Sequence, residues 1–266
     1  VGGRFLFSHS KRVPKQAEAE QEKDSCCAPH QYTRRWPTIM PQTLAGACLL
    51  TFQYVASLRV TLIRHGETEW NVQGRLQGSS DSPLTAKGIA GARACGTRLQ
   101  QFKFSAAYTS PLPRAWRTAE LILDAMHLAP TLVDDARLKE RSFGAWEGLT
   151  WNMVQTEHAD ELAIADQDPT YAPKGGGESR LATLARMLEF MDALADEHGG
   201  STQRRVLVVT HSATATCLIK HVLGLRQEQR RSFNVYNNAI NEFEYDAERG
   251  AWRLCTLGDC THLDAT

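Results

Sequence analysis

The chain has 266 residues, of which 42% are apolar, and its 30 Lys and Arg residues balance 30 Asp and Glu residues. This composition excludes a disordered chain and argues against a nucleic-acid partner, which would require a basic excess or a basic stripe. The best candidate for a membrane span, from Leu44 to Leu58, is interrupted by Gln53 and Ser57 and is too short, so no membrane association is expected.

The cysteines and the N-terminal segment bear on localisation and domain organisation. Seven cysteines, an odd number in a chain of this length, indicate a reducing compartment, and we expect a cytoplasmic protein.

Residues 1–56 mix basic and acidic side chains without apolar periodicity, which favours a disordered leader, a targeting segment or a non-native segment. A plastid or another organelle stays open if this is a transit segment, although its four acidic residues argue against one. The folded domain is predicted to cover residues 57–260.

Short apolar runs predict the strands of a sheet. Residues 60–63 and 206–210 are continuous and rich in β-branched side chains, which is typical of strands buried on both faces of a parallel sheet. Weaker candidate strands cover residues 105–109, 131–133, 235–245 and 252–256. The last two predict a hairpin that turns at residues 248–250.

Helices are predicted between these strands from caps and from three- and four-residue apolar spacing. They cover residues 85–100, 111–126, 178–198 and 212–223, with Thr85 as a cap and Pro111 in a first turn. Because strands and helices alternate, we predict the α/β class: a single three-layer, doubly wound domain with a mostly parallel central sheet.

Two predicted strands run directly into histidines. Arg64 and His65 follow the first strong strand, and His211 follows the second. Arg114 lies in the first turn of the helix after residue 110, where a positive helix end adds to its own charge. Because ligand sites in such sheets form at the carboxyl ends of the strands, these residues predict a pocket for a tetrahedral oxyanion.

The segment LIRHGETEWN at residues 62–71 resembles the signature of the histidine phosphatase superfamily, the phosphoglycerate mutase-like proteins. Further similar segments follow in order: RLQG at 75–78, LTAKG at 84–88, TSPLPRA at 109–115, LKERSFGAWEG at 138–148, GGGES at 175–179 and VVTH at 208–211. The resemblance covers residues 58–256 and is far more specific for the family than for a substrate.

The resemblance implies phosphoryl transfer in two steps. His65 would be the nucleophile and form a phosphohistidine, with its other ring nitrogen donating to a backbone carbonyl. Glu140 would be the general acid, then the base that activates water. The implied phosphate and substrate contacts come from Arg64, Asn71, Gln77, Gly78, Arg114, His211 and Ser212. We expect no metal and no cofactor, because protein cations would already cover the phosphate.

Other acidic residues are alternatives to Glu140. Glu67 and Glu69 follow the nucleophile, and we expect Glu67 to act as an orienting group. Glu147 is expected to pair structurally, and Glu178 to cap a helix and fix a loop. The chain also departs from the family pattern, since Ser212 and Ala213 follow the second histidine where two glycines are frequent. Both are small, so we expect function to survive.

Three functions remain open. The leading hypothesis is a cofactor-independent phosphatase acting on a small phosphorylated metabolite; the alternatives are a phosphoglycerate mutase of the same fold and a non-catalytic phosphate-ligand binder. A mutase must shield phosphohistidine from water, which requires a large lid. Only residues 149–177 separate Gly148, the end of the loop at 138–148 that carries Glu140 (the acid loop), from Glu178. A helix is predicted at 150–157 within this segment. A flap this short favours the phosphatase. A homodimer is left open.

Overall fold

The computed structural model describes residues 57–127, 130–199 and 204–264, so the predicted leader at 1–56 lies outside the described residues. One six-stranded sheet has the order β3-β2-β4-β1-β5-β6. The strands are β1 (Leu58–Arg64), β2 (Ala106–Thr109), β3 (Leu132–Asp134), β4 (Arg204–Thr210), β5 (Ile240–Asp246) and β6 (Ala251–Asp259). Strands β3, β2, β4 and β1 pair in parallel, whereas β5 and β6 add an antiparallel edge, so the sheet is mostly parallel as predicted.

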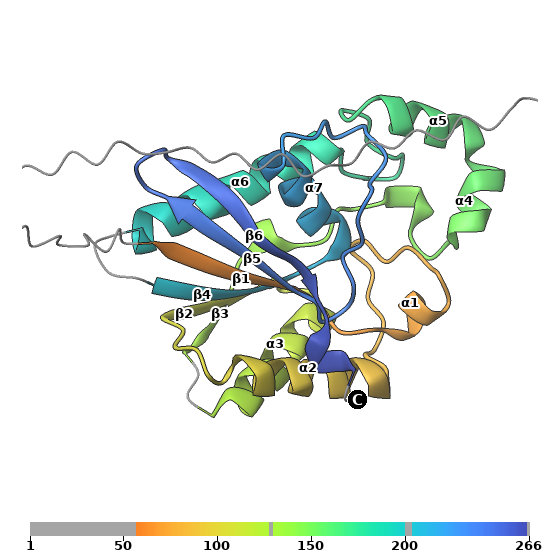
Figure 1. Ribbon diagram of the computed structural model, residues 1–266. Helices are drawn as coiled ribbons and strands as arrows, with labels where there is room; N and C mark the ends of the chain where they lie inside the picture. Colours follow the sequence, from red (N-terminus) through yellow and green to blue (C-terminus); the bar gives the residue numbers. More distant parts are fainter. Residues whose placement is uncertain (1–56, 128–129, 200–203, 265–266) are drawn as a thin grey trace, which may run out of the picture. The chain divides into compact units, whose positions relative to one another are not determined.

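Helices cover both faces of the sheet (Figure 1). They are α1 (Glu69–Val72), α2 (Ala86–Leu99), α3 (Pro113–Met126), α4 (Trp151–Glu157), α5 (Ala159–Gln167), α6 (Arg180–His198) and α7 (Ser212–Val222), with short 3-10 turns at Ala136–Leu138, Gly144–Trp146 and Thr261–Leu263. Helices α2 and α3 lie against one face, and α6 and α7 against the other. The predicted doubly wound, three-layer α/β fold is confirmed.

Side chains of the central strands alternate between two apolar cores, as strand geometry requires. Leu62 and Val208 pack in the core that contains α6 and α7. Ile63 and Val209, one residue further along each strand, pack in the core that contains α2 and α3. Continuous apolarity in β1 and β4 is therefore the mark of strands buried on both faces.

Several predicted boundaries shift for local reasons. Helix α3 begins at Pro113, not Pro111, and Leu112 is its N-cap; the residue before a proline is restricted to extended backbone. Helix α6 begins at Arg180 because the Ser179 side chain, not that of Glu178, caps it by accepting from the Ala182 N–H. Strand β5 begins at Ile240 rather than at residue 235.

The flap is more ordered than the sequence indicates. The helix predicted at 150–157 is present as α4, with Thr150 as its N-cap, and the following residues form a second helix, α5. Trp146, Val154 and Ala165 bury a small apolar cluster of their own beneath it. This satellite core anchors α4 and α5 close to the acid loop.

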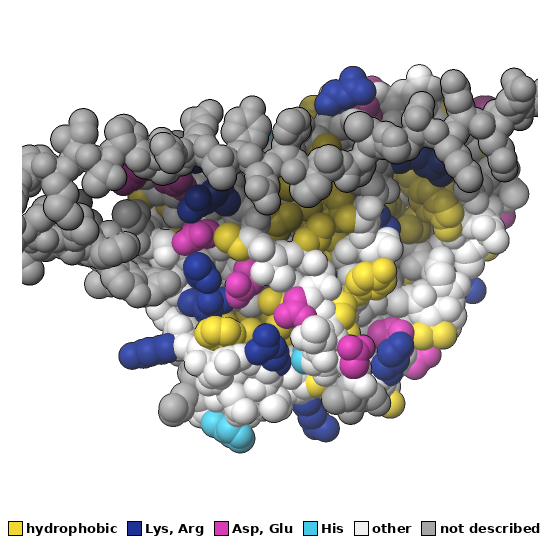
Figure 2. All heavy atoms as spheres, in the orientation of Figure 1, with side chains coloured by type: hydrophobic (Ala, Val, Ile, Leu, Met, Phe, Trp, Pro, Cys, Tyr) yellow, Lys and Arg dark blue, Asp and Glu magenta, His cyan; other side chains and the backbone are white. Residues whose placement is uncertain are grey.

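The described surface is of mixed charge on the face shown in Figure 2, where Lys and Arg side chains are interspersed with Asp and Glu side chains. Among the described residues, no helix is both long enough and apolar enough to cross a membrane.

Candidate active site

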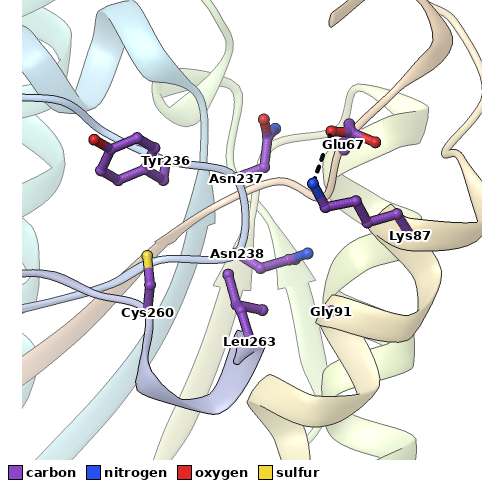
Figure 3. A pocket seen from close by; sticks show the side chains of 8 residues that line it. All are labelled: Glu67, Lys87, Gly91, Tyr236, Asn237, Asn238, Cys260 and Leu263. Atoms are coloured by element: carbon purple, nitrogen blue, oxygen red, sulfur yellow. Dashed lines mark ion pairs between the residues drawn. The ribbon is translucent and has the colours of Figure 1, made fainter. Parts of the chain in front are cut away.

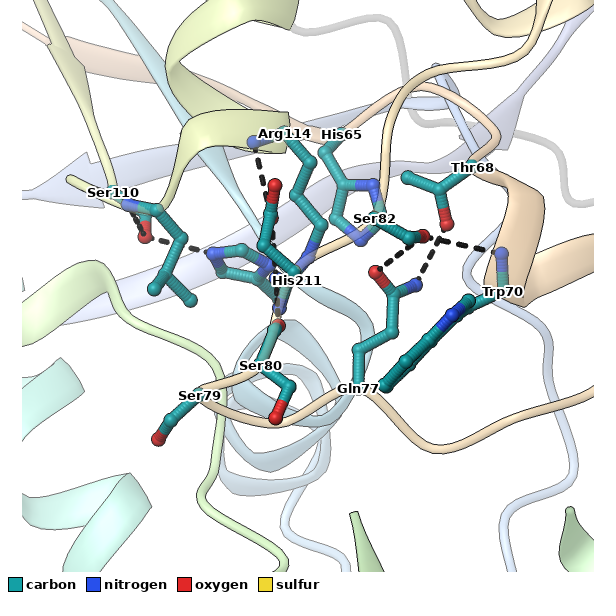
Figure 4. Close-up of polar contacts among 12 residues, drawn as sticks. His65, Thr68, Trp70, Gln77, Ser79, Ser80, Ser82, Ser110, Arg114 and His211 are labelled. Atoms are coloured by element: carbon teal, nitrogen blue, oxygen red, sulfur yellow. Dashed lines mark hydrogen bonds and ion pairs between the residues drawn. The ribbon is translucent and has the colours of Figure 1, made fainter. Parts of the chain in front are cut away.

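The candidate residues meet where the parallel strands end. His65 follows β1, Ser110 follows β2, and His211 follows β4 and occupies the N-cap position of α7. Glu140 follows the 3-10 turn after β3. The rings of His65 and His211 lie with their centroids 5.1 Å apart, and Figure 4 shows His211 between Ser110 and His65. Parallel pairing thus brings distant segments to one edge, as the strand-end argument predicts.

His65 is held as a neutral imidazole. Its side chain is buried, and Nδ1 lies 2.7 Å from the Gly66 carbonyl oxygen. A carbonyl can only accept, so Nδ1 carries the proton and Nε2 keeps its lone pair. Burial, with the nearby charges of Arg64 and Arg114, holds the pKa of His65 well below its usual value of 6.5. The predicted tautomer-fixing contact is therefore present, and Nε2 can act as a nucleophile at neutral pH.

Arg114 is fully buried and braced by the loop that follows α1. Its Nη1 donates to the Ser80 carbonyl oxygen at 2.7 Å and to Asp81 Oδ1 at 2.9 Å, and its Nη2 donates to the Gly78 carbonyl oxygen at 2.7 Å. A guanidinium has five N–H donors. These contacts use three of them and fix the orientation of the group, leaving Nε–H and one Nη2–H for another acceptor.

Three buried side-chain nitrogens near His65 lack partners among the described residues. They are Nε of Arg64, Nε of Arg114 and Nδ1 of His211. Arg64 is held by a 2.7 Å bond from Nη1 to the Val235 carbonyl oxygen, and burial lowers its pKa to about 10, which leaves it charged at neutral pH. Buried polar groups in proteins are nearly always paired. Two fixed cations and an imidazole nitrogen beside His65 therefore make a site for an anionic group.

Glu140 is seated on the first turn of α7. Its Oε1 accepts from the N–H groups of Arg141 at 3.0 Å and Thr214 at 3.1 Å, and Oε2 accepts from the Ala213 N–H at 3.2 Å. Oε2 thus has fewer hydrogen-bond partners than Oε1. Ser212, predicted to contact phosphate, is the first residue of α7 and is partly exposed. Its neighbour Ala213 directs its N–H at Glu140.

Asn71 and Gln77 are tied into the loops around His65. Asn71 forms a capping box with Thr68, and its Oδ1 also accepts from Asn237 Nδ2 at 3.2 Å, so these contacts do not engage its Nδ2. Gln77 is buried. Its Nε2 donates to Thr68 Oγ1 at 2.8 Å, and its Oε1 accepts from Ser82 Oγ at 3.3 Å. Gln77 therefore braces the site in this structure.

Gly78 contributes its backbone carbonyl to Arg114, and its backbone conformation requires a glycine. Its φ of +54° lies in the left-handed region, and a Cβ there would meet Glu147 Oε1 at 2.1 Å. Glu147 Oε1 accepts from the N–H groups of Ser79, at 3.0 Å, and Phe143, at 3.1 Å. These hydrogen bonds hold the pKa of Glu147 below its usual value of 4.5 despite partial burial. Glu147 fixes the loop that orients Arg114, in agreement with the structural interpretation.

Two of the other rival acids also have structural partners. Glu178 binds Arg186 through both oxygens, at 2.7 and 2.8 Å, which lowers its pKa despite partial burial. Glu67 accepts from Thr85 Oγ1 at 3.0 Å and lies 3.7 Å from Lys87 Nζ. Glu69 is exposed. Glu140 is the carboxylate among these that lies within the cluster of buried polar groups.

Sequence reasoning missed three contributors. Ser110 Oγ lies 2.8 Å from His211 Nε2. Thr118 Oγ1 accepts from the Gly66 N–H at 2.9 Å and joins α3 to the nucleophile loop. Asn237 Nδ2 donates to the His65 carbonyl oxygen at 2.8 Å. Each is an ordinary polar residue far from its partner in sequence. The signals were the position of Ser110 inside a family-like segment and that of Asn237 where the family often has small polar residues.

A separate hollow, of about 410 Å³, lies beside this cluster (Figure 3). Its lining includes the ion pair of Glu67 and Lys87, exposed Tyr236, and Asn237. The nucleophile and the buried donors do not line it. The candidate catalytic residues therefore belong to the polar cluster and not to the lining of this hollow. No group of three or more His, Cys, Asp or Glu side chains in the described segments is arranged to hold a metal ion.

The fold and this cluster define an α/β protein with an anion site at the carboxyl edge of its sheet. The profile of the histidine phosphatase superfamily (branch 1) matches residues 60–258. The chain therefore belongs to the histidine phosphatase superfamily. A protein named probable phosphoglycerate mutase GpmB from Escherichia fergusonii is 34% identical over 214 residues, which cover 78% of this chain and 96% of that protein.

Solved structures that are similar to the chain include two named as phosphatases. Bacillus stearothermophilus YhfR superposes with a TM-score of 0.70 at 34% identity, covering 77% of this chain and 99% of its own. A putative alpha-ribazole-5'-P phosphatase from Escherichia coli K-12 gives a TM-score of 0.67 at 28% identity, covering 76% and 97%. A mycobacterial glucosyl-3-phosphoglycerate phosphatase solved with VO3 gives a TM-score of 0.66 at 27% identity, covering 75% and 98%.

Proposed function

We propose that this protein is a metal-independent phosphatase that hydrolyses a small-metabolite phosphomonoester through a phosphohistidine on His65. The observation that carries the proposal is the buried His65, with Nδ1 on the Gly66 carbonyl oxygen, beside three buried nitrogens of Arg64, Arg114 and His211 that lack partners among the described residues. In phosphoryl transfer, charge spreads over the three equatorial oxygens. Preorganised donors in a buried site stabilise that charge strongly, which leaves no step that requires a metal.

The reaction has two balanced steps. In the first, His65 Nε2 attacks phosphorus, the bond from phosphorus to the ester oxygen breaks, and Glu140 gives its proton to the leaving alkoxide. In the second, Glu140 takes a proton from water, the resulting hydroxide attacks phosphorus, and the bond to Nε2 breaks. Inorganic phosphate leaves, and Glu140 ends protonated and His65 neutral, as they began.

The flap favours hydrolysis over mutase chemistry. It consists of α4, α5 and the loop before α6, and its one small core leaves many of its side chains exposed. Lys174, a candidate to hold a second anionic group, pairs with Glu161 at 3.0 Å. A lid of this size admits water, so a phosphoenzyme is expected to hydrolyse. The relatives carry both names, and the choice rests on this segment.

The test is a substrate panel of sugar phosphates, phosphoserine, phosphoglycerates and fructose bisphosphates, assayed for free phosphate and for isomerised product. We expect phosphate release without 2,3-bisphosphoglycerate priming and with undiminished rate in excess chelator. Priming-dependent exchange of 2- and 3-phosphoglycerate with little free phosphate would instead identify a mutase. Binding of phosphate without turnover of any substrate would identify a non-catalytic binder.

A further inference from the structure

His211 and Ser110 form a buried pair whose proton positions the geometry decides. Both residues have no exposed surface, and Ser110 Oγ lies 2.8 Å from His211 Nε2. Ser110 Oγ also accepts from the Leu112 N–H at 3.3 Å. Among the described residues, His211 Nε2 is the one acceptor within reach of the Ser110 hydroxyl proton. A fully buried hydroxyl proton without an acceptor would cost free energy, so the hydroxyl donates to Nε2.

The position of the ring proton follows from this direction. If Nε2 accepts from Ser110, it carries no proton, and the neutral ring must carry its proton on Nδ1. Nδ1 is the buried His211 nitrogen without a partner among the described residues. In the Nε2–H tautomer the Ser110 proton would have no acceptor. The Nδ1 of His211 would then present a lone pair, instead of an N–H donor, to the anion site.

We propose that Ser110 is a positioning residue: its hydroxyl holds His211 in the neutral Nδ1–H tautomer, so that Nδ1–H donates to the phosphoryl group in the transition state. The idea rests on the phosphoryl transfer proposed above. Under this proposal both histidines are Nδ1–H tautomers, but His65 turns its Nε2 toward the phosphoryl group and His211 turns its Nδ1 toward it. His65 donates its Nδ1–H to the Gly66 carbonyl oxygen, which leaves the Nε2 lone pair for attack. His211 accepts from the Ser110 hydroxyl at Nε2, which leaves its Nδ1–H to donate.

Electrostatics agree with a neutral ring at this position. Burial, followed by the charge of Arg114, holds the pKa of His211 well below its usual value of 6.5. An imidazolium there would lie next to Arg114 and the His65 ring without a carboxylate bonded to it. The Ser110 hydroxyl is neutral, so it donates a hydrogen bond to the ring without adding charge to the site.

The experiment combines histidine ring ¹⁵N NMR with kinetics. His211 resonances are assigned by their loss in His211→Gln, and Ser110→Ala is compared with Thr109→Val. Thr109 is a matched control because its buried hydroxyl donates to the Ser110 carbonyl oxygen, not to His211. We expect wild type and Thr109→Val to show His211 protonated on Nδ1. In Ser110→Ala this preference should be lost and kcat should fall on the order of 10- to 100-fold, with KM changed less, because the donor acts mainly in the transition state.

Restoring the hydroxyl with Ser110→Thr should restore the tautomer. An Nε2–H ring or an imidazolium in wild type at neutral pH would overturn the proposal, as would an unchanged tautomer and kcat in Ser110→Ala. The NMR measurement needs no substrate, so the tautomer can be established even if the panel of phosphomonoesters shows no hydrolysis. That result would refute the phosphatase and not the Ser110–His211 assignment.

Discussion

Replacing Glu140 by Gln separates proton donation from structural support. Gln keeps the shape of the side chain but cannot give or take a proton, so protonation of the leaving alkoxide is lost. General acid catalysis contributes roughly 10²- to 10⁴-fold, or about 3 to 5 kcal/mol of the barrier. We expect that loss for a sugar phosphate and a much smaller loss for 4-nitrophenyl phosphate, whose leaving group departs as an anion.

The structure also sets the cost of Glu140→Gln to stability. If the amide oxygen of the new side chain takes the Oε1 position, it keeps the N–H groups of Arg141 and Thr214, but the amide nitrogen then faces the Ala213 N–H across 3.2 Å. One donor facing another lowers the free energy of unfolding by about 1 to 3 kcal/mol. Denaturant unfolding measures this effect independently of turnover.

The assay is steady-state kcat/KM on both substrates, because this ratio reports the steps up to formation of the phosphohistidine and not its later hydrolysis, in which Glu140 acts as the base. Glu147→Gln is the matched control. Glu147 acts through the loop at Ser79 and Ser80 that orients Arg114, so its loss should slow both substrates by a similar factor. Equal losses for the two substrates in Glu140→Gln would refute the role of Glu140 as the acid.

Three further outcomes are expected. His65→Ala should abolish turnover with circular dichroism unchanged, and wild type should yield an acid-labile, base-stable phosphoryl label at His65; turnover by the variant would contradict the phosphohistidine. Gly78→Ala should lower the free energy of unfolding by about 1 to 3 kcal/mol, because a Cβ meets Glu147 and φ is positive; chemical denaturation measures it, and an unchanged midpoint would contradict the clash. The pKa of Glu178 is depressed in the folded state by Arg186, so its contribution is present above its unfolded pKa and is lost as pH falls through the folded pKa. Glu178→Gln should therefore lower the thermal midpoint at pH 7, and the deficit should disappear in acid; a deficit constant with pH would refute this linkage.

Local sequence determined much of the fold. Continuous apolar runs in β1 and β4 predicted buried parallel strands, and the three- and four-residue spacing of apolar residues predicted the helix α6. These signals are local, because they depend on which side chains neighbour one another along a strand or a helix turn. The histidines and arginines at the strand ends could be identified for the same reason, since the end of a parallel strand already indicates where a site lies.

Tertiary structure decided how those residues are held. Ser110 and His211 are 101 positions apart, and the Asn237 amide reaches the His65 carbonyl oxygen across 172 positions. Neither pairing follows from local composition, because any buried serine or asparagine seeks some partner and only the packed sheet determines which one is near. The same holds for α5, whose helix depends on the small core around Trp146. Sequence alone thus identified the groups that can carry the chemistry, whereas packing decided their tautomers, their free donors and the loops that orient them.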